Sequence, residues 1–308
     1  MRRIELNSQM PDEAVAALGG KTLGLKDFDV LVSGEDATVV RPDGSPLLVY
    51  RASALPEASC RAAWLALRHA ATRQGNRGMA AGKLPAKFRM GLRKTASISE
   101  TRIYPAKADG TASNTSYSRE VHSGIVGYFD RYQRIPYCRL TAFNLEKPER
   151  FRAALPFIRA VDRVFAENVP DRYAAQKSMI ERTSPDFYIH GTAFTTITVN
   201  RNWQTAVHQD AGDYRPGFGV MAVLQAGEYQ GGYLVFPKYR VAVDMRTGGV
   251  CMADVHEWHG NTPIVGKPGF YERISCVFYY REKMHRCGSA AEELEIAKNR
   301  KRGEWVWK

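Results

Sequence analysis

The sequence contains no long hydrophobic segment. None of its apolar runs reaches the roughly 18 residues that a membrane-spanning helix requires. The N-terminal stretch Met1-Arg2-Arg3-Ile4-Glu5-Leu6 is not followed by the apolar run of a secretory signal. We therefore expect neither a membrane span nor a signal peptide, and no membrane partner.

Cysteine is also scarce and irregularly placed. The five cysteines are odd in number, widely spaced and free of any C-x-x-C pair: Cys60, Cys138, Cys251, Cys276 and Cys287. This pattern argues against a disulfide framework and against a thiolate zinc site. We expect a reduced, intracellular protein of the cytoplasm, nucleoid or nucleus, including the host cell of a phage.

Acidic residues are nearly missing between Arg61 and Lys107, where Glu100 is the only one. The eleven cations there are Arg61, Arg68, Arg73, Arg77, Lys83, Lys87, Arg89, Arg93, Lys94, Arg102 and Lys107. This segment thus carries +10 of the formal net charge of +12. A solvated helix face with a basic loop is the simpler interpretation. Uncompensated charge around the glycine-rich run 74–82 favours a surface that faces nucleic acid.

The composition is otherwise that of an ordinary globular protein, with 44% hydrophobic and 25% charged residues among 308. The front half shows helical spacing of apolar residues over residues 57–74, 151–165 and 170–180. Pro156 interrupts the second stripe, which predicts a kink or an early start. The front half is therefore predicted to be helical.

From His190 onward the pattern changes to short runs of β-branched and aromatic residues separated by glycine and proline. The predicted strands are residues 194–199, 220–224, 233–236, 240–245, 250–253 and 274–280. Their connections are too short for the crossovers of parallel strands, which need a dozen or more residues. We predict an α+β protein whose back half is an antiparallel sandwich or jelly roll.

His208 and Asp210 form an H-x-D pair that the pattern places at the end of a strand. Side chains at i and i+2 of a strand point to the same face, so this imidazole and this carboxylate can bind one ion. His259 follows 49 residues after Asp210, and Arg273 follows another 14 residues later, at the start of the last predicted strand. Two histidines and a carboxylate describe the facial triad of non-haem Fe(II) oxygenases. An arginine on the next strand would hold the distal carboxylate of 2-oxoglutarate.

Each of these residues has a simpler interpretation when taken alone: His208 and His259 as structural histidines, and Arg273 as a surface charge. All of them in this order on antiparallel strands favour the metal site. His256 is a rival third ligand. We prefer His259, because the Gly-Asn-Thr-Pro-Ile that follows it resembles the turn after this ligand in dioxygenases. His256 then becomes a neighbour of the ligands or of the substrate.

Several segments resemble the TET/JBP dioxygenases. They are Ser123–Asp130, Cys138–Thr141, Gly191–Asn200, His208–Asp213, Gly231–Pro237, His256–Ile264 and Arg273–Ser275. The likeness covers roughly residues 75–285. It is closer to the J-binding-protein and phage-type members, because the long insertion that animal members carry before the distal histidine is absent.

The resemblance implies a double-stranded β-helix core with flanking N-terminal helices. It implies that His208, Asp210 and His259 are the catalytic iron ligands, that Arg273 binds 2-oxoglutarate, and that O2 takes a remaining position. Asp213 falls where family members place a base-recognising polar residue, although a plain turn residue after Gly212 is an equal alternative.

The same resemblance suggests a division of the chain. Residues 1–55 form an N-terminal extension of unknown role. Residues 56–285 form the dioxygenase domain, with a basic helical front over 56–185 and the β-helix core over 186–285. Residues 286–308 form a basic tail.

The resemblance further implies oxidation of the 5-methyl group of thymine or 5-methylcytosine in double-stranded DNA to 5-hydroxymethyl. A stacked base cannot bring its methyl group to a buried iron, so the base must flip out of the duplex. We expect the basic segment, above all Arg89, Arg93 and Lys94, to contact this DNA, together with His256. Candidates for stacking on the base are Trp203, Tyr214 and Phe218, although core packing is the more common role for any one of them.

Two other functions stay open. One is a 2-oxoglutarate oxygenase that acts on RNA, a nucleotide or a protein side chain. The other is a non-catalytic nucleic-acid-binding protein on the same scaffold. The oligomeric state is taken as monomeric by default.

Overall fold

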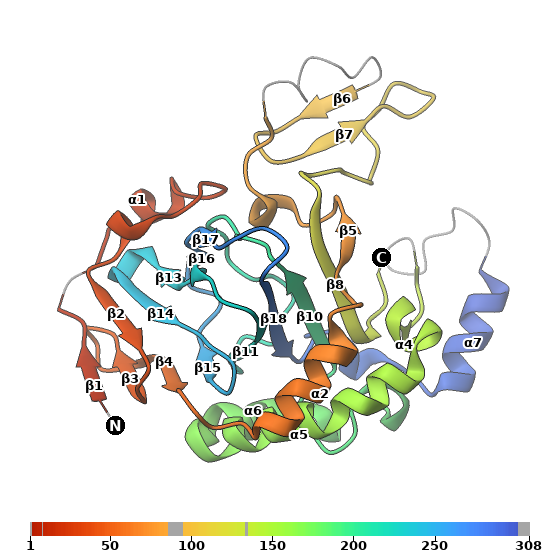
Figure 1. The fold of residues 1–308 in the computed structure, drawn as a ribbon. Helices are drawn as coiled ribbons and strands as arrows, with labels where there is room; N and C mark the ends of the chain where they lie inside the picture. The colour runs from red at the N-terminus through yellow and green to blue at the C-terminus, as the bar shows by residue number, and fades with distance from the viewer. Residues whose placement is uncertain (1, 8, 86–94, 133–134, 301–308) are drawn as a thin grey trace.

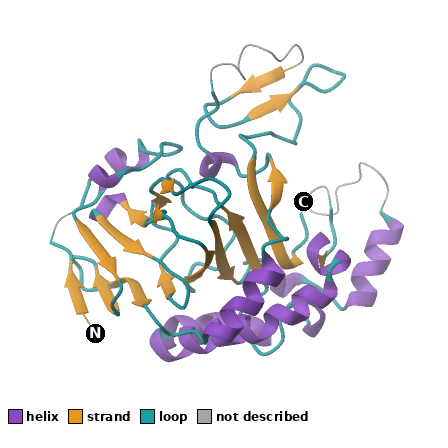
Figure 2. Ribbon diagram, viewed as in Figure 1, coloured by secondary structure: helices purple, strands orange, loops and turns teal. Residues whose placement is uncertain are grey.

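Two sheets and a layer of helices make up the fold, which a computed structural model describes for residues 2–7, 9–85, 95–132 and 135–300. Helices cover one face of the large sheet, and the small sheet packs against its other face (Figures 1 and 2). Among these residues, none of the helices is both apolar and long enough to cross a bilayer.

Among the described residues, one α-helix has 21 residues and the others have 12 or fewer. The helices are α1 (Asp12–Ala16), α2 (Glu57–Leu67), α4 (Ala142–Glu146), α5 (Pro148–Asn168), α6 (Pro170–Glu181) and α7 (Ala290–Asn299). The three helices predicted from apolar spacing are confirmed as α2, α5 and α6, although α2 ends at Leu67. Helix α5 continues through Pro156. That residue is exposed, so water can solvate the carbonyl that loses its helical partner.

The large sheet has its strands in the spatial order β1 (Arg2–Glu5), β3 (Ala37–Val40), β4 (Pro46–Arg51), β15 (Val250–Ala253), β11 (Gly219–Ala226), β18 (Glu272–Tyr279), β10 (Thr196–Arg201), β8 (Val121–Phe129) and β5 (Thr72–Gln74). Strand β9 (Arg139–Leu140) pairs with β8. The small sheet has the order β16 (Gly260–Asn261), β13 (Leu234–Phe236), β14 (Val241–Asp244) and β2 (Val30–Ser33). Two ribbons pair β6 (Thr95–Ile98) with β7 (Ile103–Pro105) and β12 (Gln230–Gly231) with β17 (Ile264–Val265).

The strands of the back half pair antiparallel, as predicted, and the core lies on both faces of the large sheet. Strand β18 runs antiparallel to β10 and to β11, and β11 runs antiparallel to β15. Along β11, Val220, Ala222 and Leu224 pack toward α2 and α5, whereas Met221 and Val223 pack toward the small sheet. This alternation with a period of two is what a strand buried between two layers requires.

Residues 2–51 contribute strands to both sheets. Strands β1, β3 and β4 extend the large sheet beyond β15, with which β4 pairs, and β2 pairs in parallel with β14 in the small sheet. Leu47, Leu48 and Tyr50 are fully or almost fully buried there. The segment for which the sequence offered no role is thus part of the packed core.

The prediction of a helical front is incomplete, because it misses the nine-residue strand β8, which pairs with both β10 and β5. Its glycines hide the strand pattern. A Cβ on Gly124 would lie 1.8 Å from the carbonyl oxygen of Ala70, and Gly127 has φ +98° and lies against the backbone of Thr195. Both positions need glycine because another backbone approaches closely.

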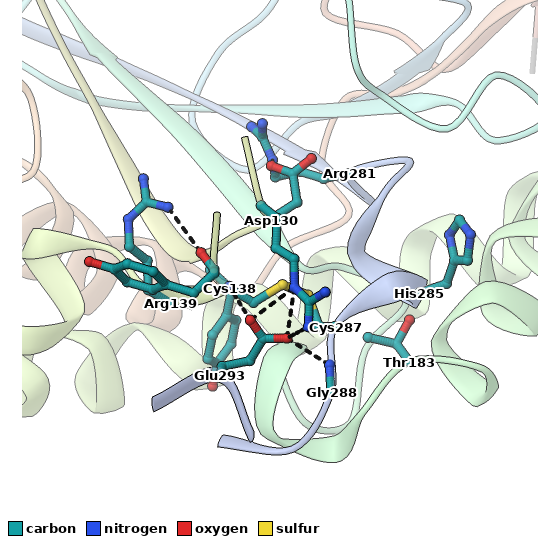
Figure 3. The surroundings of a disulfide bond; sticks show 12 residues. Asp130, Cys138, Arg139, Thr183, Arg281, His285, Cys287, Gly288 and Glu293 are labelled. Carbon is teal, nitrogen blue, oxygen red and sulfur yellow. Dashed lines mark hydrogen bonds and ion pairs between the residues drawn. A yellow bond between two sulfur atoms is a disulfide. The ribbon is translucent and has the colours of Figure 1, made fainter. Parts of the chain in front are cut away.

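The expectation of wholly reduced cysteines is wrong for two of the five, since Cys138 and Cys287 form a disulfide (Figure 3). The bond links Cys138, directly before β9, to Cys287, in the segment before α7. Beside it, the buried carboxylate of Glu293 pairs with Arg131 and accepts from the backbone amides of Cys138 and Gly288. Widely spaced cysteines carry no local signal of such a pair.

Candidate metal centre and its cavity

His208, Asp210 and His259 meet in the structure. Their side-chain donor atoms all lie within 4.8 Å of one another. The backbones of His208 and His259 exchange two hydrogen bonds of 2.9 Å, N–H to carbonyl in each direction. The prediction that the H-x-D pair lies at the end of a strand is wrong. Strand β10 stops at Arg201, and His208 makes only this isolated bridge. The bridge, rather than a strand, brings the two imidazoles together.

Backbone carbonyls fix the orientation of both imidazoles. Nδ1 of His208 lies 2.8 Å from the carbonyl oxygen of Ala206, and Nδ1 of His259 lies 2.9 Å from that of Glu257. A carbonyl can only accept, so each Nδ1 carries a proton, and each Nε2 is left facing Asp210 as the atom that can bind a metal ion. Two neutral imidazoles and a carboxylate in this arrangement fit a divalent metal ion with an open coordination sphere.

The electrostatics of the cluster favour the protonation states that a metal needs at Asp210 and His259. At His208, burial lowers the pKa, but the contact with Asp210 raises it above its ordinary value, so a metal ion would replace that proton. Burial alone would raise the pKa of Asp210, but the hydrogen bond with His208 and the charges of the neighbouring imidazoles lower it to about 2. Burial lowers the pKa of His259 to about 4, and the positive charge of His208 lowers it further. Asp210 is therefore ionised and His259 neutral at pH 7.

Arg273 lies on β18 with only 3% of its surface exposed. Its Nη2 donates to the carbonyl oxygen of Gly232 at 3.1 Å, while its Nε has no hydrogen-bond partner among the described residues. Burial lowers the pKa of this guanidinium, and Tyr229 opposes the shift. A buried guanidinium with a free N–H is a ready partner for an incoming carboxylate.

The metal cluster and Arg273 line one cavity of about 770 Å³. Its lining includes four apolar residues from the two facing sheets and their ends, namely Met221, Leu234, Met245 and Val277. It also includes polar and basic residues of the front half, among them His69, Gln74, Arg77 and Lys147. The cavity therefore offers both apolar wall and cationic groups.

The Tet_JBP family model, described as the oxygenase domain of the 2OGFeDO superfamily, matches residues 124–282. This is about half of the chain, and it contains the three clustered residues and Arg273. The chain belongs to this family. The predicted resemblance is confirmed, and the superfamily is one that uses Fe(II), 2-oxoglutarate and O2.

Related proteins agree with this Tet_JBP assignment. The thymine dioxygenase JBP1 of Trypanosoma brucei brucei is 40% identical over 166 residues, which are 52% of this chain and 19% of JBP1. The bifunctional helicase and thymine dioxygenase JBP2 of Leishmania tarentolae is 30% identical over 282 residues, which are 90% of this chain and 22% of JBP2. The chain thus spans about a fifth of the length of these relatives.

A solved structure supports the predicted jelly-roll fold of the Tet_JBP chain. NgTET1, solved in complex with 5mC DNA, superposes with a TM-score of 0.53 at 13% identity. The match covers 94% of this chain and all of that one. At this identity the likeness concerns the fold, and it confirms the α+β jelly-roll core.

Two further predicted residues lie beside the cluster in this Tet_JBP domain. His256 is not one of the three clustered residues; its Nε2 lies 3.3 Å from the backbone carbonyl of Asp213, and its Nδ1 lies 3.4 Å from Asp254. The side chain of Asp213 lines the cavity. Burial and the negative charge of Asp210 raise the pKa of Asp213 well above its ordinary value, and Arg281 opposes them.

The candidates for stacking separate into different places. Trp203 lines the cavity. Tyr214 packs edge-on against Tyr280, and Phe218 is 3% exposed in the core, so the prediction of a stacking role is wrong for Phe218. Phenylalanine is among the residues most often fully buried, and the sequence around Phe218 carries no sign that distinguishes a core residue from a stacking residue.

The basic segment is better neutralised than its sequence suggests. Among its described residues, Arg73 pairs with Glu120, Lys83 with Glu100, and Arg68 with Glu272. Two of these acids lie outside the segment, so the local count of acids could not reveal them. Arg89, Arg93 and Lys94, predicted to bind DNA, lie outside the described residues.

Sequence reasoning missed two cavity residues and underrated a third. Arg281 donates to Asp130 at 2.7 Å, and Tyr279 lies within 3.3 Å of Thr198. Arg77 lines the cavity, and its Nε and one Nη are buried without a hydrogen-bond partner among the described residues. The glycine on either side of the Asn76-Arg77 pair was the available signal, since it lets the backbone turn into the cavity.

Proposed function

We propose that this chain is an Fe(II)- and 2-oxoglutarate-dependent dioxygenase that oxidises the 5-methyl group of a pyrimidine in DNA to 5-hydroxymethyl. The observation that carries the proposal is the cluster of His208, Asp210 and His259 in the same cavity as the buried Arg273. Thymine is the proposed base, because relatives that are 40% and 30% identical are named thymine dioxygenases.

Each residue of the site has a defined task in this proposal. Nε2 of both histidines and the carboxylate of Asp210 would hold Fe(II). The free N–H of Arg273 would bind the distal carboxylate of 2-oxoglutarate, and the apolar wall that includes Met221 and Val277 would keep water away from it. When bound, the metal with 2-oxoglutarate and O2 would supply the oxidising chemistry that converts the methyl group to hydroxymethyl.

The substrate base would enter the same cavity. A methyl group inside a duplex is out of reach of a buried metal, so the base must leave the stack at a cost of a few kcal/mol. Asp213 and Arg77 offer an acceptor and donors for the Watson–Crick edge of a flipped base. Cations of the basic segment, including Arg89, Arg93 and Lys94, would bind the flanking phosphates. We take the active form to be a monomer, located in the compartment of the cell that contains its DNA substrate.

The direct test supplies the purified chain with Fe(II), 2-oxoglutarate and O2. The substrates are matched DNA duplexes, one with thymine as its only 5-methylated base and one in which uracil replaces thymine and 5-methylcytosine is present. Digestion to nucleosides and mass spectrometry should reveal 5-hydroxymethyluracil. His208→Ala should abolish the product, whereas His190→Ala, at an exposed histidine away from the cluster, should leave it unchanged.

The outcomes separate the candidate functions. Product from 5-methylcytosine alone would move the substrate to that base. Oxidation of RNA, a nucleotide or a peptide without oxidation of DNA would replace the proposed substrate class. Undiminished activity of His208→Ala would overturn the metal site itself.

A further inference from the structure

The turn Asp254–Glu257 holds the candidate metal centre from outside. The backbone carbonyl oxygens of three successive residues in this turn accept hydrogen bonds from Asp210, from its neighbour Gln209 and from His259. Val255 accepts from the backbone amide of Asp210 at 3.0 Å, and His256 accepts from Nε2 of Gln209 at 2.5 Å. Glu257 accepts from Nδ1 of His259 at 2.9 Å. The position of this turn therefore sets the direction of one imidazole and the place of the carboxylate.

Arg41 clamps both ends of the turn. Its Nη2 lies 2.6 Å from Oδ2 of Asp254 and 3.4 Å from Oε1 of Glu257. Its Nε donates to the hydroxyl of Tyr239 at 3.2 Å, and that hydroxyl donates to Glu257 at 2.8 Å. The arginine side chain is only 11% exposed. A planar guanidinium can bridge two carboxylates in a fixed geometry, which a flexible ammonium cannot.

The guanidinium is itself held in place by its own segment. Nη1 of Arg41 donates to the carbonyl of Pro46 at 2.8 Å and to the hydroxyl of Ser45 at 3.2 Å. The residue follows β3, in the N-terminal segment that precedes the family match at residues 124–282. The clamp is thus a fixed point of the N-terminal strands rather than a mobile surface charge.

A second branch leads from the clamp to the other side of the cavity. Asp254, which Arg41 binds, accepts from the backbone amide of His256 at 3.2 Å and lies 3.4 Å from its Nδ1. Nε2 of His256 lies 3.3 Å from the backbone carbonyl of Asp213. One arginine is therefore connected both to His259 and to the loop that carries Asp213.

We propose that Arg41 is a positioning residue for the metal site, acting through the turn Asp254–Glu257. The inference rests on the proposed function, since it presumes that the three clustered residues bind a metal ion. Arg41 touches none of these ligands, so its effect is on how well they are oriented. Removing such an outer partner typically weakens metal binding by about 10- to 100-fold.

The test uses Co(II), which has visible absorption, added alone to the metal-free chain. Arg41→Gln should raise the Kd for Co(II) by about tenfold or more and alter the absorption bands of the bound ion. Tyr239→Phe removes only the hydroxyl between Arg41 and Glu257, and should give a smaller shift in the same direction. This milder variant keeps the test valid if Arg41→Gln folds poorly.

Arg51→Gln is the matched control. Arg51 belongs to the same N-terminal segment and its side chain is 15% exposed, but its partners are Asp36, Asn168 and the backbone carbonyls of Ala37 and Tyr50, none of which belongs to the turn. It should lower the unfolding temperature to a similar extent and leave the Kd and the spectrum unchanged. Equal Co(II) binding by Arg41→Gln, Tyr239→Phe and the parent would overturn the role of Arg41 alone. Failure of the parent to bind Co(II) would overturn the metal site as well.

Discussion

Asp254 affects both the geometry of the candidate metal centre and the stability of the fold. Its carboxylate receives Arg41 on one side and His256 on the other. Burial alone would raise its pKa, but the hydrogen bonds from His256 and Arg41 and the positive charge of Arg41 lower it to about 2. An acid whose pKa is lower in the folded than in the unfolded chain stabilises the fold only while it is ionised.

This linkage predicts an acid-dependent effect of Asp254→Asn in the metal-free protein. The stability that the ionised carboxylate provides is fully present above its unfolded pKa, near 4, and is lost as the pH falls toward 2. The variant should therefore be less stable than the parent at pH 7, and the difference should shrink between pH 4 and 2. Urea unfolding across that range measures it. Asp171→Asn, at an exposed acid at the start of α6, should show a difference that stays small throughout.

Residue type and order in the sequence were enough to single out His208, Asp210, His259 and Arg273, because a metal triad and its cosubstrate anchor need those side chains. They were not enough for Arg41, whose contact with Asp254 spans 213 positions. The sequence next to Arg41 contains no pattern that indicates a partner so far along the chain. Long-range ion pairs depend on the register of strands, which periodicity alone does not specify.

At the scale of elements, β8 shows why a strand can be invisible in the sequence. Apolar spacing identified helices and the β-branched strands well, since burial on one face imposes a period. Strand β8 instead carries Gly124 where the backbone of Ala70 and Ala71, after α2, lies against the strand. The close approach of a neighbouring backbone requires glycine at this position, and glycine interrupts the periodic apolar pattern by which a strand is recognised.

Gly124→Ala should therefore destabilise the protein strongly. The new Cβ would lie 1.8 Å from the carbonyl oxygen of Ala70, so either β8 or the turn after α2 must move. We expect a loss of about 3 kcal/mol in the free energy of unfolding, the upper part of the usual range for overpacking. Gly24→Ala is the control, because its Cβ would have no heavy-atom neighbour closer than 3.9 Å and its φ is not positive. Urea denaturation should show a change for Gly24→Ala within about 0.5 kcal/mol, and equal effects at the two sites would refute the close approach.

At the scale of the whole molecule, the net charge of +12 is unevenly distributed along the sequence. In the described part of the basic segment, Glu100, Glu120 and Glu272 each pair with one of its cations. Such pairs reduce the long-range field from Arg68, Arg73 and Lys83. The cations of residues 87–94 consequently become the main sequence-based candidates for contact with DNA phosphates.

Replacing Arg89, Arg93 and Lys94 together by Gln tests this distribution of charge. Each phosphate contact contributes about 0.9 to the slope of log K against log salt, so three lost contacts should reduce that slope by up to about 2.7. DNA affinity should fall, while 2-oxoglutarate binding stays as in the parent, because Arg273 and its cavity are unchanged. The matched control replaces Arg2, Arg3 and Lys26, exposed cations in the N-terminal segment, with the same change in net charge. If both triple variants reduce the slope equally, DNA responds to the overall charge of the molecule and not to a binding surface. A loss of 2-oxoglutarate binding in the first variant would instead make those three residues part of the structure that supports the cavity.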